Sequence, residues 1–202
     1  MRRYFIFGFF LLGIPAAFLW HRGLHARDST IIPVVDSSVC QGPAEPIQPI
    51  PREVHLDSAK VNLGYALFND PRLSHDGTVS CSTCHALTTG GCDRPQTSVG
   101  INGQIGSVNA PTVFNSGANF RQFWDRRATT LEDQIDGPIQ ASHEMGSSWP
   151  EVVTKLSDSP AYVVSFSAIY GDGIKARSVK DAIATFECSL ITPDSGFDQY
   201  LR

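Results

Sequence analysis

Hydrophobic residues in the segment 55–202 recur at the spacing of helices, and no alternation typical of β-strands persists there. The first helix is predicted over residues 57–68, where Asp57 can cap the start and Asn69-Asp70-Pro71 ends the pattern. Its apolar side is formed by Val61, Ala66, Leu67 and Phe68. The periodicity therefore predicts a mainly α fold for this segment.

Four further helices are predicted, three of them from capping signals at their start. They are Thr129–Ile135, a helix opened by a capping box of Ser148 with Glu151 and running to about Leu156, a helix opened by Ser159-Pro160 and running to about Ile169, and a helix opened by Ser178 with Asp181. The last one carries a broad apolar face of Val179, Ile183, Phe186 and Leu190.

Two stretches lack helical periodicity. Residues 28–54 contain five prolines and few periodic apolar positions, which is typical of a tether or a loosely packed arm. The stretch 90–111 is rich in glycine and proline, which is typical of a long loop laid over a ligand. The predicted domain therefore covers residues 55–202 and combines helices with long loops.

The N-terminus, residues 1–27, is predicted to be a targeting segment. Two arginines precede an uncharged run of seventeen residues, Tyr4 to Trp20. This length is at the lower limit for a membrane span and at the upper limit for the apolar region of a signal peptide. No clear small-residue cleavage site follows, which favours an uncleaved anchor over a cleaved signal. Both alternatives export the chain, so we expect a periplasmic domain, anchored or free.

Composition narrows the classes of partner. The chain has 202 residues, which suits one or two small domains, and its net charge is −4. Domains that bind nucleic acid are usually basic, so the charge argues against a nucleic-acid partner.

Residues 81–85 read Cys-Ser-Thr-Cys-His, the CxxCH signature of c-type haem attachment. On a helical turn, Cys81, Cys84 and His85 fall at i, i+3 and i+4 and point to one face. The two thiols can then add to the haem vinyl groups while the imidazole of His85 ligates the iron. One covalent haem c is therefore the predicted cofactor.

The CxxC pair has two alternative interpretations, a redox disulfide and half of a zinc site. Residues 76–80 are a turn and a short extended piece, whereas a thioredoxin-like motif lies in a βαβ unit. A structural zinc site needs four ligands, usually in two close pairs, but Cys40 and Cys92 are single. One pair of the remaining cysteines can form a disulfide, and Cys188, in an apolar helical run, is expected to be a buried thiol.

Six sequence blocks occur in order over the 140 residues from Leu63 to Arg202. They are LGYALFNDPRLSHDGTVSCSTCH, TSVG, NAPTVFN, QFWDRRATTLEDQIDGPIQ, HEMG and LITPDSGFDQYL. In this combination the chain resembles the bacterial di-haem cytochrome c peroxidase family, which includes the MauG-like enzymes. The resemblance implies a cytochrome c-like haem domain equivalent to the first, peroxidatic domain of that family. The family's second domain receives electrons from a small donor protein.

The resemblance also implies roles for residues that match the family's motifs. Cys81 and Cys84 match the thioether anchors, and His85 matches the proximal ligand. Glu144 matches the distal glutamate that moves a proton from hydrogen peroxide to the leaving oxygen, and Gln134 the glutamine that helps to hold peroxide. Trp124 matches the tryptophan between the two haems, and Asn109 a ligand of an inter-domain calcium ion.

Two departures from the family pattern change these expectations. The chain has a single CxxCH motif, so the electron-entry haem and most other calcium ligands are missing from it. The histidine that follows TSVG in the family and caps the iron is replaced by Ile101, which has no donor atom. We therefore expect an open or water-bound iron, with His143 or His75 as alternative sixth ligands.

The predicted function is that of a haem peroxidase, which reduces hydrogen peroxide to water. The electrons would come from a cytochrome c, a cupredoxin or a separate second haem domain. The alternatives are a MauG-like oxidase of another substrate, a non-enzymatic electron carrier and a truncated remnant. A carrier needs a sixth ligand such as Met or His, but Met145 beside Glu144 is expected to pack at the haem edge instead.

Overall fold

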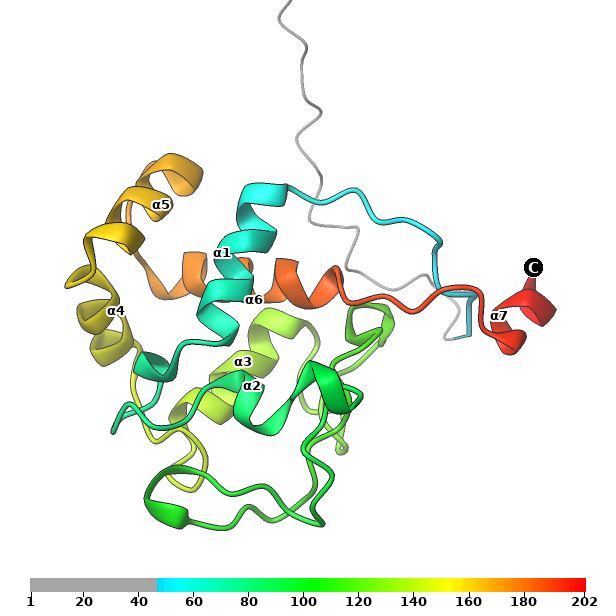
Figure 1. The fold of residues 1–202 in the computed structure, drawn as a ribbon, viewed down its shortest axis with the longest axis horizontal. Helices are drawn as coiled ribbons and strands as arrows, with labels where there is room; N and C mark the ends of the chain where they lie inside the picture. Colours follow the sequence, from blue (N-terminus) through cyan, green and yellow to red (C-terminus); the bar gives the residue numbers. More distant parts are fainter. Residues whose placement is uncertain (1–46) are drawn as a thin grey trace, which may run out of the picture. The chain divides into compact units, whose positions relative to one another are not determined.

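The computed structural model describes residues 47–202, and Figure 1 shows their helices. These are α1 (Ser58–Phe68), α2 (Cys81–Cys84), α3 (Leu131–Gln140), α4 (Trp149–Ser157), α5 (Pro160–Tyr170), α6 (Ala176–Cys188) and α7 (Gly196–Leu201). Four 3-10 turns, η2 (Pro71–Leu73), η3 (Leu87–Thr89), η4 (Ile101–Gly103) and η5 (Ser116–Ala118), lie in the connecting segments. Extended pairing within the described residues is limited to two isolated bridges, so the predicted mainly α fold is confirmed.

The core forms where α1 packs against α6 (Figure 1). Leu67 and Phe68 of α1 and Val179 and Ile183 of α6 are fully buried. Burial of each such side chain stabilises the fold by about 1.5–3 kcal/mol. The two helices approach so closely at Gly64 that a Cβ there would overlap the backbone carbonyl oxygen of Ala182.

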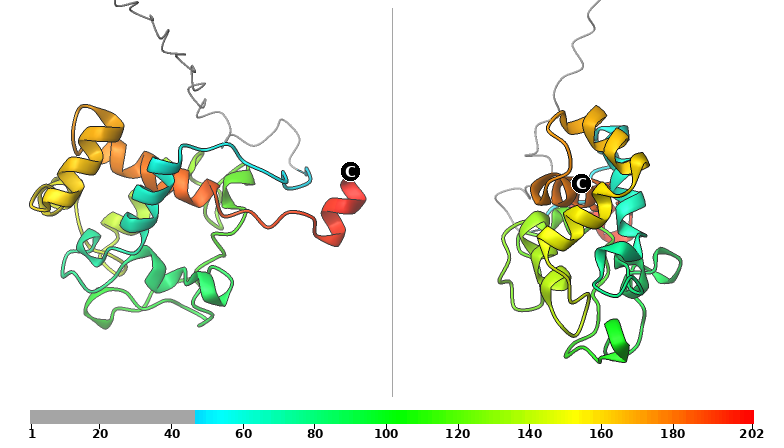
Figure 2. Two further views of the ribbon diagram at one scale, coloured as in Figure 1. Left: turned by 45° about the horizontal axis from the view of Figure 1, so that its top comes forward. Right: turned by 90° about the vertical axis from the view of Figure 1, so that its left-hand side faces the viewer.

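Helices α4 and α5 extend this core (Figure 2). Leu156 of α4 and Phe166 of α5 are completely buried. Asp70, a carboxylate that is 6% exposed, accepts hydrogen bonds from the Tyr162 hydroxyl of α5 at 2.7 Å and from Arg72 Nη2 at 2.6 Å. Burial raises the pKa of Asp70, but the bonds from Arg72 and Tyr162 outweigh that effect and hold the pKa below its ordinary value. This buried anion therefore ties α5 to the turn after α1.

The helix starts follow the capping signals only in part. Ser148 caps α4 by accepting a hydrogen bond from the Glu151 backbone N–H. The Glu151 carboxylate, however, pairs with His75 at 3.0 Å and Lys155 at 2.7 Å, so the reciprocal half of the predicted capping box is absent. The predicted helix after Ser159 is confirmed, because α5 begins at Pro160.

Two predicted boundaries are wrong. Helix α6 begins at Ala176, so Ser178 lies inside the first turn and is not the N-cap residue. The Ser178 hydroxyl accepts a hydrogen bond from the Lys175 backbone N–H at 3.0 Å. Helix α3 was expected over residues 129–135 but spans Leu131–Gln140 and contains Pro138. Burial of Ile139, which is 1% exposed, favours continuing α3 past the proline.

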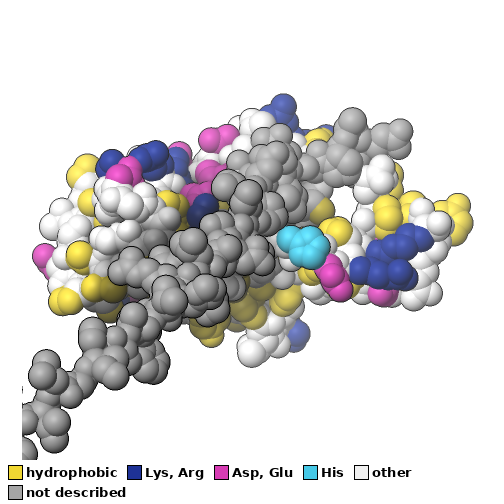
Figure 3. Space-filling model, turned by 90° about the horizontal axis from the view of Figure 1, so that it is seen from above, with side chains coloured by type: hydrophobic (Ala, Val, Ile, Leu, Met, Phe, Trp, Pro, Cys, Tyr) yellow, Lys and Arg dark blue, Asp and Glu magenta, His cyan; other side chains and the backbone are white. Residues whose placement is uncertain are grey.

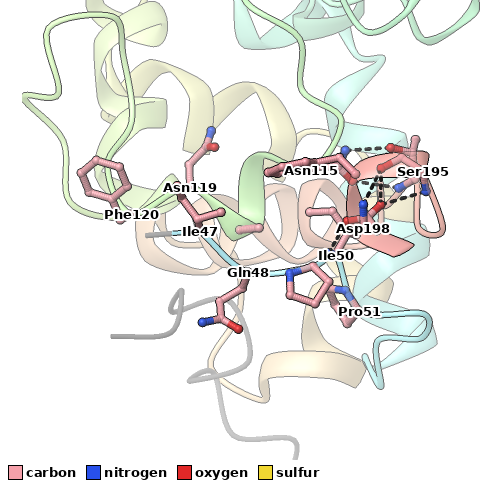
Figure 4. A pocket seen from close by; sticks show the side chains of 13 residues that line it. Ile47, Gln48, Ile50, Pro51, Asn115, Asn119, Phe120, Ser195 and Asp198 are labelled. Carbon is pink, nitrogen blue, oxygen red and sulfur yellow. Dashed lines mark hydrogen bonds between the residues drawn. The ribbon is translucent and has the colours of Figure 1, made fainter. Parts of the chain in front are cut away.

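The predicted targeting segment, residues 1–27, Cys40 and most of the predicted tether, residues 28–54, lie outside the described residues. The described end of that tether is attached to the C-terminal segment: the Ile50 backbone N–H donates to the Asp198 carboxylate at 2.8 Å. Residues 47–51 line a pocket with residues around η5 and α7 (Figure 4). From residue 47 onwards, no helix is both long and apolar enough to cross a membrane.

Charged side chains of both signs are interspersed on the face shown in Figure 3. The ion pairs of the described residues include Lys60 with Asp181, Lys180 with Asp136 and Arg52 with Asp194. Pairs this exposed contribute little individually, about 0–1 kcal/mol each. The free energy of folding therefore rests mainly on the buried faces of α1, α4, α5 and α6.

The contact at Gly64 leads to a prediction about stability. Gly64→Ala should lower the free energy of unfolding by about 2 kcal/mol, because the added methyl group would force α1 away from α6. Gly196→Ala is the matched control, since a Cβ there would meet nothing within 4 Å. Urea denaturation of the haem-loaded protein measures both. Equal stability of the two variants would contradict the close packing of α1 on α6.

Candidate haem site

The CxxCH motif occupies the single turn of α2 and the residue after it, as predicted. The Ser80 backbone N–H donates to the Thr83 hydroxyl at 3.0 Å at the start of the turn, and the His85 N–H donates to the Cys81 carbonyl at 2.9 Å at its end. Cys81 and Cys84 carry free thiols. The i, i+3 spacing on this turn places the two thiols on one side, as attachment to a single porphyrin requires.

The imidazole of His85 is held by two backbone carbonyls. Its Nδ1 lies 3.2 Å from the Gly91 oxygen and 3.0 Å from the Pro111 oxygen. Because both partners are acceptors, Nδ1 carries the hydrogen, and the lone pair of Nε2 is left for a metal. Burial lowers the pKa of His85 although these hydrogen bonds raise it, so the ring is neutral at pH 7. A neutral, oriented imidazole suits haem iron.

The two thiols of the motif are uncharged, and a nearby buried carboxylate oxygen has no hydrogen-bond partner among the described residues. Burial raises the pKa of Cys81 to about 12 and also raises that of Cys84, so both are neutral thiols in the chain without haem. Asp93 Oδ1 is buried with no hydrogen-bond partner among the described residues, whereas the Ser98 hydroxyl is a hydrogen-bond partner of the Cys84 thiol. Asp93 is also near enough to His85 to act on it electrostatically. These groups fit a covalently bound haem c, because Cys81 and Cys84 provide two free thiols and His85 provides an oriented imidazole.

Glu144 lies within electrostatic range of this motif. Its carboxylate is near enough to act electrostatically on both Cys84 and His85. The Ile101 backbone N–H donates to the Glu144 carbonyl at 2.8 Å, and Gly100 packs directly against the same loop. The side chain of Glu144 is 44% exposed, with His143 Nε2 3.7 Å from its Oε1. The structure thus brings Glu144, Ile101 and the CxxCH turn together from three separate segments.

The other residues predicted from the resemblance are less closely linked to the motif. Gln134 is half-buried on α3, and its side chain makes no hydrogen bond to another described residue. Met145 is 3% exposed and belongs to the hydrophobic core. Trp124 is 63% exposed, and its Nε1–H donates to the Asn109 carbonyl at 3.2 Å, so these two residues are neighbours.

Asn109, the calcium ligand implied by the resemblance, does not lie in a cluster of acidic, histidine or cysteine side chains among the described residues. Asn109 is exposed, and among residues 47–202 no group of three or more His, Cys, Asp or Glu side chains is arranged to hold a metal ion. Calcium also binds backbone carbonyls, amide oxygens and water, so the role of Asn109 as a calcium ligand stays a prediction. The alternative sixth ligand His75 is held by the Glu151 carboxylate, whereas His143 lies beside Glu144.

Two further residues differ from the sequence-based expectations. Cys188 is disulfide-bonded, so the prediction of a buried thiol is wrong. Glu187, which the sequence analysis did not single out, is 6% exposed on α6. Burial, followed by the negative charge of Glu132, raises the pKa of Glu187 to about 8. The sequence signal that could have identified Glu187 is the presence of a charged residue on the otherwise apolar face of this helix.

Comparisons with known proteins show the family to which the chain belongs. The family model for di-haem cytochrome c peroxidase matches residues 58–202. The chain is 52% identical over 159 residues to the cytochrome c peroxidase Ccp of Escherichia coli (strain K12). The aligned region covers 78% of this chain and 34% of that protein. The chain is 39% identical over 154 residues to the methylamine utilization protein MauG of Methylorubrum extorquens, with coverage of 75% and 44%.

A solved structure supports the same grouping. A MauG-like protein associated with microbial copper homeostasis superposes with a TM-score of 0.67 at 31% identity, over 79% of this chain and 48% of that one. The chain spans less than half the length of each of these three relatives. Through residues 58–202, the chain belongs to the di-haem cytochrome c peroxidase family.

Proposed function

We propose that this chain is a peroxidase domain that reduces hydrogen peroxide to water with electrons from a cytochrome c or a similar small donor. The observation that carries the proposal is that the Glu144 carboxylate lies within electrostatic reach of His85 and Cys84 in the CxxCH motif, on a loop that is hydrogen-bonded to Ile101. A carboxylate next to an oriented metal-binding imidazole supplies the two groups that peroxide cleavage needs, a proton carrier and a metal ligand.

We assign the residues as follows. Cys81 and Cys84 anchor the haem through thioethers, and His85 Nε2 binds the iron. When bound, the haem supplies the iron at which peroxide is reduced and the path by which electrons reach it. Glu144 would accept a proton from hydrogen peroxide and return it to the departing oxygen. The balanced reaction takes one peroxide, two electrons and two protons to two waters.

The remaining residues have supporting roles in this proposal. Gln134 holds peroxide or water by its amide, and Met145 packs at the haem edge. Trp124 lies at the surface beside Asn109 and provides an aromatic ring through which an electron can enter. The donor is a small cytochrome, a cupredoxin or a separate second haem domain.

A MauG-like oxidase of another substrate is the second candidate, and Ile101 is the observation that favours it. This residue is 5% exposed and lies beside Glu144, at the position where the peroxidases of the family carry an iron-capping histidine. An iron that the chain does not cap is open to substrates without prior reduction. The two candidates differ in whether peroxide consumption oxidises cytochrome c.

We propose a periplasmic location, with the N-terminal segment as an export signal or anchor. The disulfide at Cys188 supports this proposal, because disulfides persist in oxidising compartments. The covalent attachment of haem to CxxCH, which bacteria complete outside the cytoplasm, supports it as well.

Substitution of Glu144 tests the proposed chemistry. Glu144→Gln should lower peroxide turnover by about 10²–10⁴-fold, because the amide cannot carry the proton. The measurement is steady-state oxidation of reduced cytochrome c by the haem-loaded protein, with Glu53→Gln, an exposed carboxylate outside the site, as control. Unchanged turnover in Glu144→Gln would sink the assignment. Peroxide loss without cytochrome oxidation in the wild type would favour the oxidase.

The iron environment gives a second prediction. The oxidised wild-type protein should show the absorption and electron paramagnetic resonance spectra of high-spin haem, because Ile101 offers no ligand. Ile101→His should convert the spectra to low-spin bis-histidine haem. Val99→His, at an exposed position in the same loop, should leave them high-spin. A low-spin wild-type spectrum would contradict the open site, and His143→Ala and His75→Ala would then identify the ligand.

A further inference from the structure

Glu187 is a buried acid that the proposed peroxide chemistry does not use. It lies near the end of α6 and is 6% exposed. Its carboxylate forms no hydrogen bond and no ion pair with another residue in the segment 47–202. Burying an unpaired charge costs folding free energy. A buried carboxyl group without a partner therefore either lowers the stability of the fold as a carboxylate or is protonated and neutral for part of the time.

The groups that face Glu187 supply no positive charge. The carboxylate lies near enough to Cys81 of α2 to raise the pKa of that thiol, and near enough to Glu132 of α3 to be affected by its charge. The lysines at the other contacts of α6 are already paired, Lys60 of α1 with Asp181 and Lys180 of α6 with Asp136. The surroundings therefore favour the neutral, protonated acid.

The position of Glu187 links this proton to the haem. Cys81 packs against the core cluster that contains Phe186 and Cys188, the two neighbours of Glu187, and its thiol would be one of the two thioether anchors, so an attached haem would lie within electrostatic range of the carboxyl group. In a poorly solvated environment, charges interact more strongly than in water. A carboxylate is then stabilised by a positive charge on the iron and loses that stabilisation when the iron gains an electron. The small exposed part of the residue leaves a route for exchange with solvent.

We propose that Glu187 takes up a proton when the haem held by Cys81, Cys84 and His85 accepts an electron, and releases it when the electron leaves. The step is balanced: one electron from the donor reduces ferric to ferrous iron, and one proton from solvent converts the Glu187 carboxylate to the acid. No bond to the haem forms or breaks. The inference rests on the proposed haem site but not on Glu144, and one of the two protons of peroxide reduction would enter in this way.

Redox titration of the haem-loaded full chain tests the proposal. The reduction potential is measured by absorption in a spectroelectrochemical cell from about pH 5 to about pH 9.5, a range that brackets the ordinary and raised carboxyl pKa values. The wild-type potential should fall with rising pH over part of this range, approaching about 59 mV for each tenfold drop in proton concentration. Glu187→Gln should remove that slope, because the amide does not titrate.

Glu132→Gln is the matched control. It removes the neighbouring negative charge and keeps Glu187, so the slope should remain and its pH window should move to lower pH. A pH-independent wild-type potential, or a slope that persists in Glu187→Gln, would overturn the proposal. Protein without covalent haem would instead refute the haem site itself, so the two failures are distinguishable.

A second measurement needs no variant. The infrared difference spectrum between reduced and oxidised wild-type protein should contain the carbonyl band of a carboxylic acid that forms on reduction and shifts in D2O. If Glu187→Gln does not fold, this band still decides the question, since its absence contradicts proton uptake by a buried acid.

Discussion

The close approach of α1 and α6 at Gly64 is the constraint on which the rest of the domain depends. A side chain at this position would overlap the Ala182 carbonyl, so the crossing is possible only with glycine. Around it, Phe68 and Phe186 pack edge to face with ring centroids 5.2 Å apart. Helix α6 then provides the surface against which α3, α4 and η5 pack. The haem-binding turn α2 follows α1 and η2 in the chain, and Glu144 lies between α3 and α4. The crossing of α1 and α6 determines the positions of these helices.

Polar interactions take over where helices end. The segment between α2 and α3 has almost no regular structure, yet it is held by backbone carbonyls and amides. The Gly91 carbonyl accepts from the imidazole of His85 and from the backbone N–H of Val113, and the Thr112 hydroxyl donates to the Gly90 carbonyl. A loop organised around the proximal histidine fixes the tautomer of its ring before any metal binds. The same contacts that stabilise the loop therefore prepare the ligand.

The domain treats its buried acids in two ways. Asp70 is surrounded by donors from Arg72 and Tyr162, and its pKa is held low, so it remains a structural anion. Glu187 has no such donors, faces another carboxylate, and has a raised pKa. A buried charge without a partner costs folding free energy. Asp70 therefore stabilises the fold as a paired anion, whereas Glu187 is available for proton exchange.

Local signals in the sequence determined much of this protein. The CxxCH spacing specified the α2 turn, Asp57 and Ser159-Pro160 marked the starts of α1 and α5, and the ordered blocks specified the family. These features depend on residues a few positions apart, which short-range hydrogen bonds and side-chain periodicity govern.

Only the tertiary structure decided how distant segments meet. It showed that the Glu144 loop is hydrogen-bonded to Ile101 within electrostatic range of His85, that Trp124 contacts Asn109, and that α3 continues through Pro138 to bury Ile139. It also placed Glu187 within electrostatic range of Cys81 and revealed the disulfide at Cys188. Such outcomes depend on contacts across many residues and on the desolvation that packing imposes. Local sequence patterns do not predict long-range contacts or desolvation, because burial and long-range neighbours exist only once the chain has folded.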